Sequence, residues 1–102
     1  MFFQVTHIHT NEHCPGVVKE IGDKMDDWWA ALKSNADVKV HGAYVSPTSH
    51  TFHITLEAND YGPVAKLLGP LNEIGTGNVE PMIPFDVAFQ LADQNTFRLP
   101  GS

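Results

Sequence analysis

Two strand–helix–strand patterns joined by a short turn leave few folds open to this chain of 102 residues. Apolar residues between Val17 and Lys33 recur at helical spacing, whereas Phe52, Ile54 and Leu56 alternate with polar residues as in a half-buried strand. The sequence Ser46-Pro47-Thr48-Ser49 predicts a tight hairpin turn. The predicted elements are a strand at 2–9, a helix at 17–33, strands at 38–45 and 51–57, a short helix through 64–68, and a last strand at 79–89.

Local signals set the boundaries of the second half. Asn59-Asp60 can cap the second helix, and Gly69-Pro70 is expected to end it. Residues 75–78 are expected to form a Gly-rich turn, and Pro81 and Pro84 then predict an edge or bulged strand. The tail from about residue 92 is polar and is expected to be peripheral, packed on a neighbour or frayed.

This order predicts an α+β fold, the ferredoxin-like βαββαβ sandwich, in a single domain over residues 1–102. The antiparallel four-stranded sheet would have the order 4-1-3-2, with both helices on one face. In this order of elements, the chain resembles the dimeric α/β-barrel superfamily over about residues 2–90. That superfamily includes muconolactone isomerases, antibiotic-biosynthesis monooxygenases and haem-degrading monooxygenases. The resemblance implies a homodimer in which two sheets face each other, which would cover an open face bearing Val38, Val40 and Tyr44.

Charge and cysteine content exclude several classes of partner. The net charge is −6, and the six basic residues are scattered, so no basic stripe is available for nucleic acid or an anionic membrane. A single cysteine cannot form an internal disulfide. The opening Met1-Phe2-Phe3-Gln4 lacks the pattern of a signal peptide, and no apolar run is long enough to span a bilayer, so we expect a cytoplasmic protein.

Metal-ligating and titratable side chains are concentrated in the segment Thr6–Pro15, which contains three imidazoles, a carboxylate and the only thiol of the sequence. His7 and His9 have strand spacing i, i+2, which places both rings on one face about 7 Å apart and makes a two-residue clamp for a transition metal. The predicted topology brings five of the six histidines and the cysteine to one edge of the sheet. His41 alone lies apart and is expected to be structural.

Strand faces refine this expectation. A Ser46–Ser49 turn would place Gly42 opposite His53 and Tyr44 opposite Thr51. His53 and Tyr44 would then point to the face that a dimeric barrel encloses, with His41 on the helix-covered face. In the first strand, Phe3 and Val5 are expected to be core residues, which would direct His7 toward the helices and away from His53; alternatively, the Gln4 and Thr6 face is the one that lines the barrel. The sequence alone leaves both arrangements open.

The candidate ligands are His7, His9 and His53, with His13 as a further histidine in the loop. Cys14 or Glu12 would be the fourth ligand or an acid/base group, and a thiol at the start of a helix has a lowered pKa. Mixed imidazole and thiolate ligands favour zinc or copper over magnesium or calcium. The ordinary alternatives are backbone-bonded histidines, a buried inert cysteine and a solvated glutamate.

Two classes of function fit these residues. In the first, the protein is a metal-dependent enzyme that acts on a small molecule, with three ligands and an open position. In the second, a metal-free barrel binds, isomerises or oxygenates a small organic ligand, with a histidine as general base and Tyr44 as hydrogen-bond donor. A non-catalytic ligand-binding oligomer is also compatible with the fold.

Overall fold

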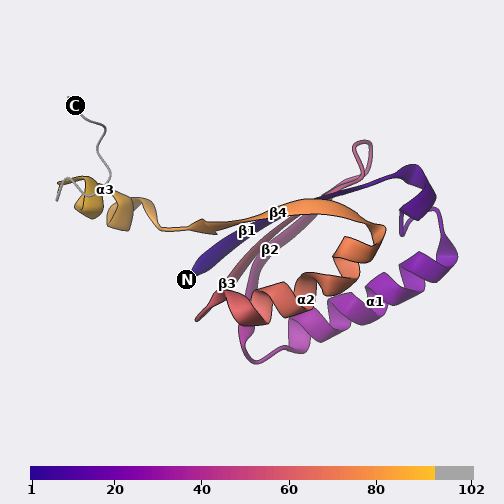
Figure 1. Ribbon diagram of the computed structural model, residues 1–102, viewed down its shortest axis with the longest axis horizontal. Helices are drawn as coiled ribbons and strands as arrows, with labels where there is room; N and C mark the ends of the chain where they lie inside the picture. Colours follow the sequence, from indigo (N-terminus) through magenta and orange to yellow (C-terminus); the bar gives the residue numbers. More distant parts are fainter. Residues whose placement is uncertain (94–102) are drawn as a thin grey trace.

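The computed structural model describes residues 1–93. It contains one four-stranded antiparallel sheet, and two long helices cover one face of this sheet (Figure 1). The elements in chain order are β1 (Phe2–His9), the 3-10 helix η1 (Asn11–His13), α1 (Lys19–Ser34), β2 (Val38–Ser46), β3 (Thr51–Ala58), α2 (Tyr61–Ile74), β4 (Gly75–Met82) and α3 (Phe85–Asp93).

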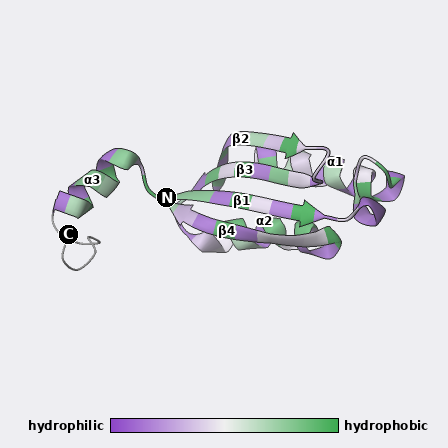
Figure 2. Cartoon of the chain, turned by 90° about the horizontal axis from the view of Figure 1, so that it is seen from above, coloured by the Kyte–Doolittle hydropathy of each residue, from purple (hydrophilic) through white to green (hydrophobic). Residues whose placement is uncertain are grey.

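The sheet has the order β2-β3-β1-β4, which confirms the predicted ferredoxin-like α+β arrangement. Its helix-covered face buries Phe3, Val5, Ile54 and Leu56, and Leu32 of α1 completes this part of the core. The other face is open, because both long helices lie on one side of the strands (Figures 1 and 2). Its central residues are mostly polar, as expected for an antiparallel sheet with one solvated face.

The β2–β3 hairpin pairs Tyr44 with His53 and Ser46 with Thr51, so the predicted register was wrong by two residues. A shift of two preserves the side-chain alternation, and His53 lies on the open face as expected. His41 is different, because the pairing skips it between Val40 and Gly42. This irregularity brings the His41 ring to Glu57 on the open face, with 2.7 Å between Nε2 and Oε1, and corrects its predicted place on the helix-covered face.

Helix α2 begins as predicted and ends later. The Asp60 carboxylate accepts a hydrogen bond from the Gly62 N–H and caps the helix. Gly69-Pro70 does not end it: the helix continues to Ile74 and buries Leu71. Proline in a helix costs about 3 kcal/mol and each fully buried leucine contributes about 1.5–3 kcal/mol, so burial of the last turn offsets the local penalty.

Strand β4 starts at Gly75, so the predicted turn at 75–78 is wrong. A Cβ atom on Gly75 would collide with the Ile8 carbonyl oxygen, and one on Gly77 with that of Thr6. These glycines therefore allow β4 to lie close against β1. Pro81 is accommodated because β4 is an edge strand, as its prolines predicted.

The last predicted strand is also too long. Phe85–Asp93 forms the helix α3, which follows Pro84 and lies away from the sheet and the other helices (Figure 1). The predicted peripheral tail falls mainly on residues 94–102, outside the described residues. Among residues 1–93, no helix is both long and apolar enough to cross a membrane.

Candidate metal centre

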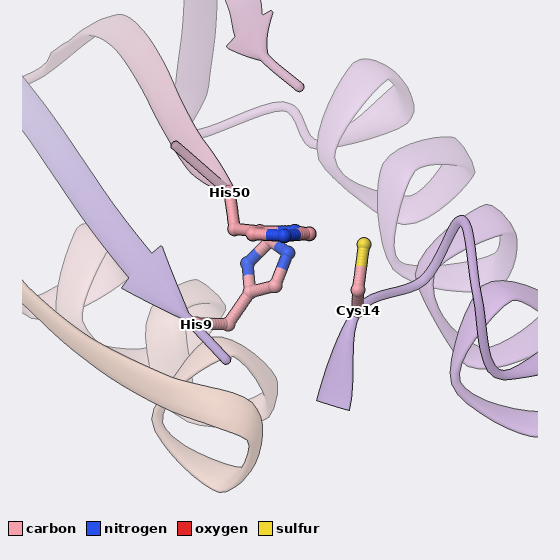
Figure 3. Close-up of side chains that lie close together, drawn as sticks. All are labelled: His9, Cys14 and His50. Carbon is pink, nitrogen blue, oxygen red and sulfur yellow. The ribbon is translucent and has the colours of Figure 1, made fainter. Parts of the chain in front are cut away.

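Three side chains from separate parts of the sequence meet at one end of the sheet. His9 is the last residue of β1, Cys14 follows η1, and His50 is the last residue of the β2–β3 loop (Figure 3). One ligand atom from each residue lies within 4.8 Å of the other two. Two imidazoles and a thiol at this spacing form a donor set for a transition metal.

Backbone contacts hold the two histidines together. The His9 N–H donates to the His50 carbonyl oxygen at 3.1 Å, which extends the pairing of β1 with β3 by one step. The two rings then lie 5.4 Å apart, edge to face. His50 has φ of 51°, in the left-handed region that histidine adopts only occasionally. This turn of the backbone places the His50 ring above the end of β1 (Figure 3).

His9 is the unusual member of the group. Its side chain is only 5% exposed, yet neither ring nitrogen has a hydrogen-bond partner among the described residues. Burial lowers the pKa of His9, and the neighbouring His7 and His50 lower it further. The ring is therefore held neutral, the form in which imidazole nitrogens bind metals. A buried imidazole without partners usually has an unseen one, such as water or an ion.

Cys14 reaches the cluster from a turn, which corrects its predicted place at the start of a helix. Its carbonyl oxygen accepts hydrogen bonds from the N–H groups of Val17 and Val18, and α1 begins only at Lys19. The thiol is partly exposed and faces the two imidazole rings (Figure 3). Cys14 therefore lies in the turn that precedes α1 and not at the N-terminus of the helix.

His7 lies beside the cluster and has a partner of its own. Its ring is buried, and Nε2 donates to the Leu71 carbonyl oxygen of α2 at 2.8 Å. Burial lowers the pKa of His7, against the opposing effect of this hydrogen bond. In β1, Phe3 and Val5 face the core, which is one of the two arrangements that the sequence left open. His7 and His9 share this face and point toward the helices. His7 therefore ties β1 to α2, next to the candidate ligands.

The structure does not bring the other predicted site residues to this cluster. His53 lies on the opposite face of the sheet, where Nε2 is 3.3 Å from the Ser46 hydroxyl. Tyr44 shares that face and is 75% exposed. Glu12 and His13 are exposed in η1, and the His13 ring bonds to the Thr10 hydroxyl. The expected convergence of His53 with His7 and His9 is therefore not observed.

His50 was not among the predicted ligands. A histidine beside a turn is a weaker candidate for a ligand than one within a strand. The missed signal was the hairpin length: with Ser46 paired to Thr51, the loop consists of residues 47–50 and returns His50 to β1.

Comparisons with known proteins support the fold. No family model matches the chain, and no curated protein matches its sequence. The structure is similar to the crystal structure of SCO4226 from Streptomyces coelicolor A3(2), with a TM-score of 0.55 and 13% sequence identity. The match covers 82% of this chain and 98% of that one. At this identity the likeness establishes a shared fold, and membership of the dimeric α/β-barrel superfamily stays a prediction.

Proposed function

We propose that the protein binds one transition-metal ion through His9, Cys14 and His50. The observation that carries this proposal is His9, a buried imidazole with two unpartnered nitrogens beside a thiol and a second imidazole. Leaving such a ring without partners costs stability, and coordination of a metal by one nitrogen relieves part of that cost.

The ligand types favour zinc or copper. Thiolate and imidazole are ligands for both ions, whereas magnesium and calcium prefer oxygen. In a tetrahedral zinc site, metal–ligand distances of about 2.0–2.3 Å place neighbouring ligand atoms about 3.5 Å apart. The separations of up to 4.8 Å would close through modest side-chain rotation on binding.

Three protein ligands leave a fourth position. Cys14 and His50 are partly exposed, so this position is open to solvent and to a water molecule or small ligand. An incomplete ligand set is typical of catalytic zinc sites, whereas structural sites are closed by four protein ligands. The site is thus suited to act on, or to sense, a small molecule that binds the ion.

The test is metal content and binding affinity. We expect purified protein stripped of metal to take up one equivalent of Zn²⁺, and C14S or H50A to weaken binding by at least about 10-fold. Co²⁺ should give a thiolate-to-metal charge-transfer band that disappears in C14S.

Matched controls use histidines outside the cluster. H53A and H13A remove an imidazole from the open face and from η1, and both should retain the affinity of the unsubstituted protein. Equal affinity in C14S, H50A and the controls would contradict the proposed ligand set. Absence of stoichiometric binding by the unsubstituted protein would contradict the function itself.

A further inference from the structure

Helix α3 carries apolar side chains that lie uncovered among the described residues. Phe85 is 80% exposed and Phe89 is 63% exposed, and their rings stack 5.9 Å apart on one side of the helix. None of the residues of α3 is buried. An isolated helix of nine residues is unstable in water, because most helical stability comes from packing an apolar face. The helix therefore requires a docking surface.

An apolar groove lies at the opposite edge of the sheet. It has a volume of about 400 Å³ between α1 and the end of the β2–β3 hairpin, and its lining includes Trp28, Trp29, Ala43, Val45 and Phe52. Val45 is 56% exposed, although it lies on the helix-facing side of its strand. Helix α1 thus leaves this corner of the sheet uncovered.

The connection before α3 is too short to bring the start of the helix to the groove of its own chain. Strand β4 ends at Met82, level with Phe2 of β1, whereas Val45 is level with Gly77. The groove therefore lies about 16 Å back along the strands and about 14 Å across the sheet from Met82. Phe85 follows Met82 by three residues, which span at most about 10 Å. The sheet order thus separates α3 from the groove by more than its connection spans.

We propose that α3 docks in the groove of a second copy of this chain, and that two copies exchange these helices in a symmetric dimer. Each buried phenylalanine removes about 150–250 Å² of its own surface from solvent. Because Phe85 is 80% and Phe89 63% exposed before docking, the four rings and an equal area of groove surface give about 900–1,400 Å², which overlaps the lower part of the 1,200–2,000 Å² of a stable interface. This inference does not depend on the metal site, which lies on other elements.

The two tryptophans make the test specific, because both line the groove and the chain has no others. Sedimentation of the full chain should show a dimer. Dilution to the monomer should shift tryptophan emission to the red, since Trp28 and Trp29 lose their apolar cover. F89D should abolish both the dimer and the concentration-dependent emission shift, and V45D should do the same from the groove side.

The matched control is Q90D, which adds the same charge to the adjacent, exposed residue of α3. It should retain the dimer. A monomer at all concentrations would overturn the proposal. A dimer that persists in F89D with unchanged emission would also overturn it, and would indicate pairing through the open sheet faces. Emission that stays blue-shifted at every concentration and moves to the red only in F89D would also overturn the proposal, because it would place α3 in the groove of its own chain.

Discussion

His9 is buried, and neither nitrogen of its ring has a hydrogen-bond partner among the described residues. Its position after Phe3, Val5 and His7 in the alternation of β1 directs the ring into the helix-covered side of the sheet. That alternation could be predicted from the sequence, but which of its two faces packs on the helices could not. The missing partners of the ring could not be predicted, because they depend on where Cys14 and His50 arrive.

The buried histidines predict how stability depends on pH. In the unfolded chain their pKa is 6.5, and folding lowers it. Below pH 6.5 the unfolded chain therefore binds more protons than the folded protein, and the free energy of unfolding falls as the pH decreases. Above that pH these groups contribute no slope. Urea denaturation of the metal-free protein between about pH 5 and 7.5 measures this effect.

The control for this prediction is the exposed His13. H13Q should keep the pH profile, whereas H9Q should have a shallower one. A free energy of unfolding that does not change down to about pH 5 would show that His9 and His7 are not buried as neutral rings.

The backbone of His50 allows its two roles to be separated. A residue with a Cβ in the left-handed region destabilises the folded protein by about 1–2 kcal/mol, and H50G would remove this strain. Glycine also raises the entropy of the unfolded chain, which lowers stability by about 0.5–1 kcal/mol. H50G should therefore leave the metal-free protein as stable, or make it up to about 1 kcal/mol more stable. The same variant should lose its affinity for Zn²⁺. Denaturation and metal titration on one sample test both parts. A destabilised H50G protein would mean that the ring itself supports the hairpin.

At the scale of elements, the predictions that failed were a helix end and a turn that rested on glycine and proline. Gly69-Pro70 and residues 75–78 carry strong local signals for helix end and turn, and tertiary contacts override both. The two long, periodic elements, α1 and β3, were predicted within one or two residues. Hydrophobic periodicity predicts elements well because it reflects which face of an element is buried in the folded protein. Turn signals reflect only local backbone preferences, which tertiary contacts can override.

The glycine at the start of β4 has a testable role. A Cβ in G75A would collide with the Ile8 carbonyl oxygen and crowd the His7 ring and the His9 Cα atom. We expect a loss of about 2 kcal/mol or more in the free energy of unfolding, with weaker Zn²⁺ binding because β1 shifts. Thermal or urea denaturation and a metal titration measure the two effects.

Gly69 provides the matched control, because nothing lies within 4 Å of a Cβ built there. It lies inside α2 but precedes Pro70, whose ring disfavours a preceding Cβ in helical conformation and offsets the gain in helix propensity, so G69A should change the free energy of unfolding by less than about 1 kcal/mol. If G75A were as well tolerated as G69A, the close contact between β4 and the end of β1 would not be a feature of the folded protein.

For the whole molecule, the order of elements predicted the fold class and the strand order, since connection rules leave few alternatives for this succession. The candidate site was predicted only in part. The predicted topology identified the end of the sheet and two of the three ligands, His9 and Cys14. His50 could be identified only from the register of the hairpin. His53 was predicted to join the cluster, but it lies on the other face of the sheet. A two-residue difference in register cannot be resolved from alternation, because it leaves every side chain on the same face.

The central claim is that one metal ion joins β1, the loop after it and the β2–β3 hairpin. The measurement that tests this most directly is X-ray absorption at the metal edge of the zinc-loaded protein. We predict a first shell of one sulfur at about 2.3 Å, with two imidazole nitrogens and one lighter ligand at about 2.0–2.1 Å. The sulfur contribution should disappear in C14S and remain in H53A. A shell of nitrogen and oxygen alone, identical in C14S and in the unsubstituted protein, would contradict the account.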